Sequence, residues 1–250
     1  MEPVGDEVHL SRGLKSRGEL GIFQSLIEAL SVVAKGDFDD VVHIAEDDNV
    51  YMPLAGQAIS NFSRILLSKQ KYSNVDIIFL DYFMTLELFK YVVSIKNKLA
   101  PGQVRFLPAK RFYLAGCGSF LVRKSSAYFL SKLLSNILDS ADALVPVDIA
   151  LRSLFRMGAL SGLLSVPSFS APCWEQDESS SIQGDSDDSR RFSQRSHILL
   201  RLLASGAKTP QWCSQTLEQL SGVKSPAVTQ IDYDSFCSYF ESLNDSMVSF

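Results

Sequence analysis

The amino-acid sequence predicts an α/β protein in which helices flank a central sheet and a small helical part follows toward the C-terminus. Two short apolar runs, residues 41–45 and 75–82, have the composition of buried strands. Helical periodicity precedes and follows each run, and strands that alternate with helices are typical of this class. A later stretch is rich in Ser and Asp and almost lacks apolar residues. We therefore divide the chain into a domain over residues 18–172, a flexible loop over 173–195 and a helical region over 196–250.

Each expected element depends on residue spacing and on the residues at its ends. Apolar residues at helical spacing predict a helix over residues 20–34, which Gly36 would end. A strand over residues 41–45 follows. The further elements are expected, in order, as a helix from Pro53 to residue 67, a strand over 75–82, a helix over 86–99, strands within 104–122, a helix over 127–138 capped by Ser125 or Ser126, a helix over 149–155 and a strand over 160–166.

Length and composition exclude several classes of protein. With 250 residues, 46% of them hydrophobic and 21% charged, the chain has the composition of a globular protein with a substantial core. Its net charge of -4 argues against a nucleic-acid-binding protein. Its N-terminus lacks the apolar segment of a secretory signal, and no apolar stretch is long enough to span a membrane. The four cysteines lie far apart, which suits a reducing cytoplasm. Taken together, these features lead us to expect a cytoplasmic protein that contacts membranes at most peripherally and binds no nucleic acid.

Three consecutive carboxylates, Glu46, Asp47 and Asp48, follow the strand over residues 41–45. In open α/β sheets, ligands bind beyond the carboxyl ends of the strands. Acidic side chains crowded there repel one another unless solvent or a cation screens them. The cluster therefore favours a divalent metal that carries a phosphorylated substrate. A solvated acidic turn between strand and helix explains the same residues.

Several segments of the chain follow an order that is known from one family of enzymes. They are GIFQS at 21–25, HIAEDDNV at 43–50, DIIFLD at 76–81, GSFLVRKSSAYFLSKLL at 118–134, PVDIAL at 146–151, SVPSFSAP at 165–172 and SSSI at 179–182. This ordered set resembles glycosyltransferase family 25, the lipopolysaccharide and collagen galactosyltransferase group. The chain departs from the family in three places, one of which is the late segment, where the family's Gln and Asp have no clear counterpart. No strand of the INLDRRPDR type precedes residue 20, and Leu26 follows Ser25 where the family commonly has His.

The resemblance implies a GT-A-like domain that transfers a hexose, galactose or glucose, from a UDP-sugar donor to a lipopolysaccharide or other glycoconjugate acceptor. It also implies Mn²⁺ or Mg²⁺ as cofactor, because a cation held by carboxylates neutralises the diphosphate as its charge develops. Alternate residues at a strand end face the same way. We therefore expect Asp48 and Glu46 as metal ligands. His197, after the Ser/Asp-rich loop, is a candidate third ligand, and the resemblance implies Glu46, Asp47, Gly21 and Ser25 at the nucleotide sugar.

An inverting transfer also needs a carboxylate base that takes the proton from the acceptor hydroxyl. Asp148 is the first candidate, because its Pro-x-Asp setting matches the family, and Asp81 is the second. Apolar neighbours would raise the pKa of either carboxyl. A helix N-cap at Asp148 and a strand-end cap at Asp81 explain the same residues equally well.

Other interpretations stay open at this point. A transferase-like domain that binds a glycan or a protein partner without catalysis would carry the same motifs. Residues 214–231 have the spacing of a helix-turn-helix, although Pro226 and the scarcity of basic residues argue against DNA binding. We predict His43, inside the first strand, to be a core residue. Gly116 and Gly118 flank Cys117 and mark either a bulge or a place where a ligand approaches the backbone.

Overall fold

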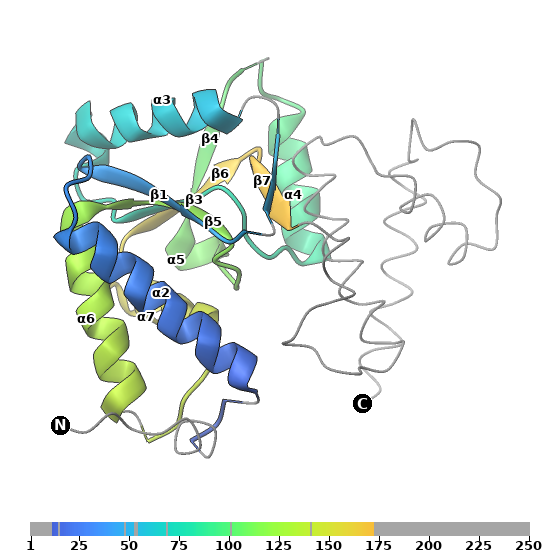
Figure 1. Ribbon diagram of the computed structural model, residues 1–250. Helices are drawn as coiled ribbons and strands as arrows, with labels where there is room; N and C mark the ends of the chain where they lie inside the picture. The colour runs from blue at the N-terminus through green and yellow to red at the C-terminus, as the bar shows by residue number, and fades with distance from the viewer. Residues whose placement is uncertain are drawn as a thin grey trace, which may run out of the picture.

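A mixed five-stranded sheet, with helices on both faces, forms the centre of the computed structural model (Figure 1). The structure describes residues 12–172 except residues 15, 48, 53, 54, 69, 101 and 141. The predicted α/β class is therefore confirmed for this part of the chain. Several predicted features lie outside the described residues. They are Asp48, the expected loop over 173–195, and the expected helical region over 196–250 with His197 and the helix-turn-helix candidate.

Three strands of the sheet point in one direction, so their carboxyl ends meet at one end of the sheet. The strands are β1 (Val41–Ala45), β3 (Ile77–Phe79), β4 (Arg105–Pro108), β5 (Ser119–Arg123) and β6 (Gly162–Val166), in the spatial order β1-β5-β3-β6-β4. Strand β5 is antiparallel to β1 and to β3, and β6 is parallel to β3. Strands β1, β3 and β6 are therefore co-directional, and β4 runs antiparallel to β6 at one edge. A separate two-stranded ribbon pairs β2 (Asn49–Tyr51) with β7 (Ser170–Pro172).

The helices cover the sheet unequally and enclose two apolar cores. They are α2 (Arg17–Lys35), α3 (Ala55–Ser68), α4 (Leu86–Lys96), α5 (Ala109–Phe112), α6 (Lys124–Ser140), α7 (Val147–Met157) and the 3-10 turn η1 (Gln70–Tyr72). The larger core joins α2, α6 and α7 to one face, and the smaller core joins α3 to the other. None of the helices described is long and apolar enough to cross a membrane.

Helix α2 is fixed at both ends, which matters because it forms one wall of the candidate site. The Ser16 hydroxyl accepts a hydrogen bond from the Glu19 amide at 3.1 Å, as expected of a helix N-cap. At the other end, the Lys124 ammonium donates to the carbonyl of Gly36 at 2.7 Å. Phe23 and Leu30 on the inner face of the helix are fully buried. The expected helix over 20–34 is confirmed. It begins three residues earlier than expected, at Arg17, directly after the N-cap Ser16.

Two expectations about the middle of the chain are wrong. Residues 104–122 do not form strands throughout, because α5 and the loop over 113–118 separate β4 from β5. In that loop Tyr113 turns into the core and stacks on Phe79, with 4.5 Å between ring centroids. Neither Ser125 nor Ser126 caps α6, because the helix already begins at Lys124. Ser126 instead donates a hydrogen bond to Asp76 at 2.6 Å.

Candidate functional site

The acidic turn after β1 lies at the carboxyl end of the sheet and is attached to the start of β5. The Glu46 amide donates to the carbonyl of Gly118 at 2.8 Å. The side-chain amide of Asn49 donates to the same carbonyl at 2.7 Å, and the Asn49 backbone amide donates to the carbonyl of Glu46 at 3.4 Å. Both ends of the turn are therefore held against one backbone position, which fixes Glu46 and Asp47 relative to β5.

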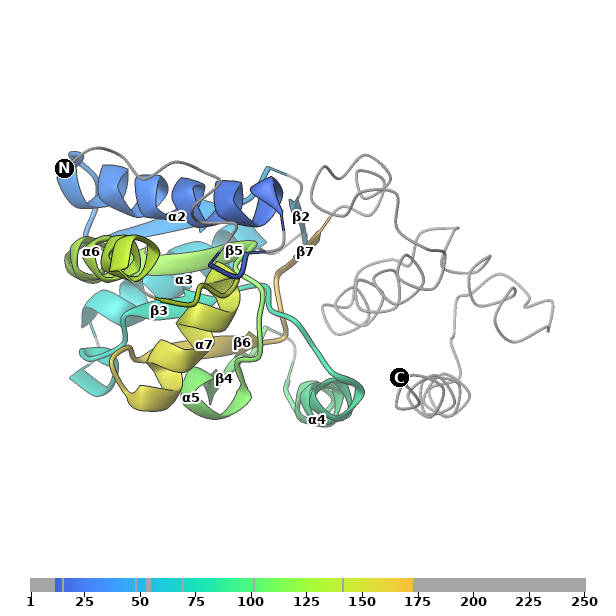
Figure 2. The ribbon, with the colours of Figure 1, turned by 90° about the horizontal axis from the view of Figure 1, so that it is seen from below.

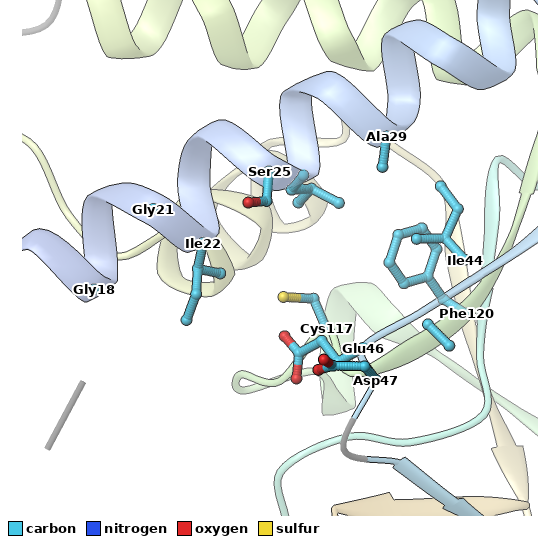
Figure 3. Close-up of a pocket in the computed structure, with 12 residues that line it drawn as sticks. Gly18, Gly21, Ile22, Ser25, Ala29, Ile44, Glu46, Asp47, Cys117 and Phe120 are labelled. Carbon is cyan, nitrogen blue, oxygen red and sulfur yellow. The ribbon is translucent and has the colours of Figure 1, made fainter. Parts of the chain in front are cut away.

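A cavity of about 510 Å³ separates this turn from α2 (Figure 3). Ile22 projects from α2 toward the cavity, whereas Glu46, Asp47 and Cys117 lie together on its opposite side (Figure 3). The four residues expected at the nucleotide sugar come from segments far apart in sequence, and all four line this cavity: Gly21, Ser25, Glu46 and Asp47.

Gly21 leaves a gap in the wall that α2 forms. A Cβ atom built at Gly21 meets no other atom within 4 Å, so the space beside the helix backbone is open. Ser25 lies one helical turn further along and is exposed. The helix therefore offers open backbone and a hydroxyl to a ligand in the cavity, opposite the two carboxylates.

A second cavity, of about 430 Å³, adjoins the first and contains Asp148. The two cavities share Ile22, Glu46 and Cys117 in their walls. Glu46 therefore lies between a cavity that holds the expected nucleotide-sugar residues and a cavity that holds the first candidate base.

Asp148 is held by backbone amides on two sides. It is the second residue of α7, whereas Pro146 takes the N-cap position, so an N-cap role for Asp148 is wrong. One carboxylate oxygen accepts a hydrogen bond from the Ile149 amide at 2.8 Å, and the other accepts from the Gly116 amide at 3.4 Å. A negative charge in the first turn of a helix is also stabilised by the helix dipole. These contacts orient the carboxylate at the wall of the second cavity.

Asp81, the second candidate base, lies in the interior. Its side chain is fully buried and lines neither of the two cavities. A Cβ atom built at Gly118 would lie 3.0 Å from an Asp81 carboxylate oxygen and 3.0 Å from the side-chain nitrogen of Asn49. Burial and, to a smaller extent, the Asp81 carboxylate raise the pKa of the Tyr82 hydroxyl above its usual value. Asp81 is therefore enclosed by neighbouring side chains behind the acidic turn and does not reach either cavity. Asp148, in contrast, lines the second cavity.

Sequence reasoning did not assign a role to Cys117, although the cysteine lines both cavities. The flanking glycines were the available signal. Gly116 has a φ of +90°, and a Cβ atom there would lie 3.0 Å from the amide nitrogen of Phe83. The hydroxyl of Tyr113 donates to the carbonyl of Gly116 at 3.0 Å. These contacts fix the backbone at Gly116, and the next residue, Cys117, lines both cavities.

The carboxylates present fit a cation that arrives with a substrate. Within the described ranges, no group of three His, Cys, Asp or Glu side chains converges as a protein-only metal site would require. Mg²⁺ and similar cations at phosphate sites are often held by one or two carboxylates together with phosphate oxygens. Glu46 and Asp47 at the first cavity supply such a donor set, and the positions of Asp48 and His197 lie outside the described residues.

Comparison of the chain with models of protein families gives no match. Comparison with curated proteins gives no match either.

Proposed function

We propose that the protein is a GT-A-like, metal-dependent glycosyltransferase that moves a hexose from a UDP-sugar to a glycoconjugate acceptor. The observation that carries the proposal is the place of Glu46, which lines two adjoining cavities at the carboxyl end of the sheet. Ligands of α/β sheets bind at this end. The cavity volumes of about 510 and 430 Å³ fall within the range of roughly 300–1,000 Å³ that small-molecule sites occupy.

In this proposal the donor lies in the first cavity. Gly21 leaves room for the nucleotide beside α2, and Ser25 offers it a hydroxyl. Glu46 would hold Mn²⁺ or Mg²⁺ together with Asp48, the acid two positions later in the sequence, and Asp47 would contact the nucleotide sugar. When bound, the cation supplies positive charge that neutralises the leaving diphosphate.

The acceptor hydroxyl lies in the second cavity beside Asp148. Its oxygen forms a bond to C1 of the hexose while the bond between C1 and the diphosphate oxygen breaks. UDP leaves with the electron pair of that bond, and the hydroxyl proton passes to the Asp148 carboxylate. The hydrogen bonds from the amides of Ile149 and Gly116 orient the carboxylate for this transfer.

The test measures UDP-hexose turnover and UDP affinity, each with and without Mn²⁺. We expect Asp48→Ala and Glu46→Gln to lose Mn²⁺-dependent UDP affinity and turnover. We expect Asp148→Asn to lose turnover by roughly a hundredfold or more while it keeps UDP affinity. Asp39→Asn removes an exposed carboxylate that lines neither cavity, so it serves as the matched control.

Three outcomes separate the alternatives. A wild-type protein with neither turnover nor Mn²⁺-dependent affinity for UDP would overturn the proposal. Mn²⁺-dependent UDP affinity without turnover of any UDP-hexose would favour the non-catalytic binding domain. Retention of full turnover in Asp148→Asn would remove this residue from the role of base.

A further inference from the structure

Basic residues gather on one group of neighbouring elements, although the chain as a whole is acidic. Residues 86–112, from α4 through α5, contain six basic residues and one acidic residue, Glu87. Helix α7 adds two basic residues, Arg152 and Arg156, and one acidic residue, Asp148. With a net charge of -4 for the whole chain, this group of elements is electrostatically opposite to the rest. Such a separation of charge indicates a surface that meets a negatively charged partner.

Three contacts, made by Tyr91, Arg111 and Lys110, connect α4, α5 and the residue after α7. Tyr91 of α4 stacks on Phe112 of α5, with 5.3 Å between centroids and 10° between ring planes. The guanidinium of Arg111 lies 5.2 Å from the centroid of the same Phe112 ring. The ammonium of Lys110 lies 4.0 Å from the Cβ position of Gly158, the residue directly after α7. In Figure 2, α5 lies beside α7, and α4 lies apart from α7 on the other side of α5.

We call this surface the cationic face and define it by six exposed residues: Tyr91, Lys98, Lys110, Arg111, Arg156 and Met157. Lys98 is an exposed residue in the turn that directly follows α4. The face also exposes apolar area. Met157 is 71% exposed and Tyr91 is 44% exposed, and Met157 has the largest exposed fraction among the large hydrophobic side chains described.

We propose that the cationic face docks on a membrane surface that contains anionic lipids. Each Lys or Arg near such a surface strengthens binding by roughly fivefold. An apolar side chain among the cations can enter the boundary between headgroups and acyl chains, and Met157 is placed to do so. The proposal does not depend on transferase activity, because it concerns a surface outside both cavities.

A nucleic acid fits this face less well. Tyr91 covers the Phe112 ring and Arg111 lies against it, so this aromatic pair is already engaged and does not offer an open face to a base. The acidic remainder of the chain would repel a long polyanion. An exposed methionine supports insertion into lipid and contributes little to phosphate recognition.

The experiment sediments the full chain with vesicles of phosphatidylcholine, with and without phosphatidylglycerol, at low and high salt. We expect binding only to the anionic vesicles, with a loss of binding at high salt. Lys110→Glu/Arg111→Glu/Arg156→Glu should weaken binding by roughly a hundredfold or more. The matched control, Lys35→Glu/Lys71→Glu/Lys132→Glu, changes the net charge equally at exposed positions on α2, η1 and α6 and should bind much more strongly.

A second variant keeps the test decisive if the triple variant fails to fold. Met157→Ser leaves the charge unchanged and should weaken vesicle binding severalfold. Equal loss of binding in the face variant and in the matched control would overturn the proposal, as would equal binding to neutral and anionic vesicles. Binding of single-stranded RNA in preference to anionic vesicles, abolished by the same face variant, would replace the membrane with a nucleic acid.

Discussion

The Nε2 atom of His43 lies 2.9 Å from the hydroxyl of Ser119, which joins edge strand β1 to β5 just behind the acidic turn. The His43 and Tyr51 rings meet edge to face, with 5.7 Å between centroids. His43 therefore has a hydrogen-bond partner, but the prediction of a core residue is wrong, because on the edge strand its side chain is only half-buried.

The free energy of unfolding should decrease as the pH is lowered, because of His43. Burial lowers the pKa of its imidazole below the usual 6.5. The side chain is therefore neutral in both states above pH 6.5, and below that pH the unfolded chain binds a proton more readily than the folded chain. The free energy of unfolding should decrease as pH falls from about 7 toward 5, and His43→Gln should reduce that decrease. Urea unfolding of both proteins at several pH values measures the difference. An identical pH dependence in the two proteins would contradict the assignment.

Gly118→Ala should destabilise the protein. The new methyl group would lie 3.0 Å from polar side-chain atoms of Asn49 and Asp81, and Asp81 is fully buried. We expect a loss of about 1–3 kcal/mol in the free energy of unfolding, measured with urea. Gly56→Ala is the control, because a methyl group there meets no atom within 4 Å and should cause no loss. A Gly118→Ala protein as stable as wild type would contradict the packing described around the acidic turn.

Gly21→Ala should separate stability from ligand binding. Gly21 lies inside α2 and a methyl group there meets no protein atom, so alanine should stabilise the fold by roughly 0.5–1 kcal/mol. The same methyl group would project beside the first cavity, so UDP affinity in the presence of Mn²⁺ should fall. Thermal unfolding and calorimetric titration provide the two readouts. Unchanged UDP affinity in the stabilised variant would show that no ligand approaches α2 at this position.

Elements with a strong local signal were predictable from the sequence. The run Val41-Val42 with Ile44, ended by acids, predicted a strand over 41–45, and β1 has these bounds. Helix α2 followed from its apolar periodicity, and three residues of the predicted stripe, Leu20, Phe23 and Leu30, are buried in the core. The same kind of signal located α6, although its start was placed too late because serines there were interpreted as caps.

Features that depend on distant partners were not predictable. Strands β2 and β7 have three residues each, and their pairing joins Asn49 to Pro172 across more than a hundred residues, so neither carries a local pattern. Tyr113 has high strand propensity, yet it lies in the loop between α5 and β5, where its ring packs on Phe79. At the site, the motif order brought Gly21, Ser25, Glu46 and Asp47 to attention, and the structure places them around one cavity. The sharing of Glu46 with the Asp148 cavity required the fold itself.

Helix α7 has Asp148 in its first turn and Arg156 and Met157 at its last. At 1.5 Å per residue, the distance along the helix from Asp148 to Met157 is roughly 14 Å. A protein that rests on a bilayer through the far end of this helix would hold its Asp148 cavity well above the headgroups. If both proposals hold, an acceptor sugar would have to extend from the bilayer surface to reach Asp148.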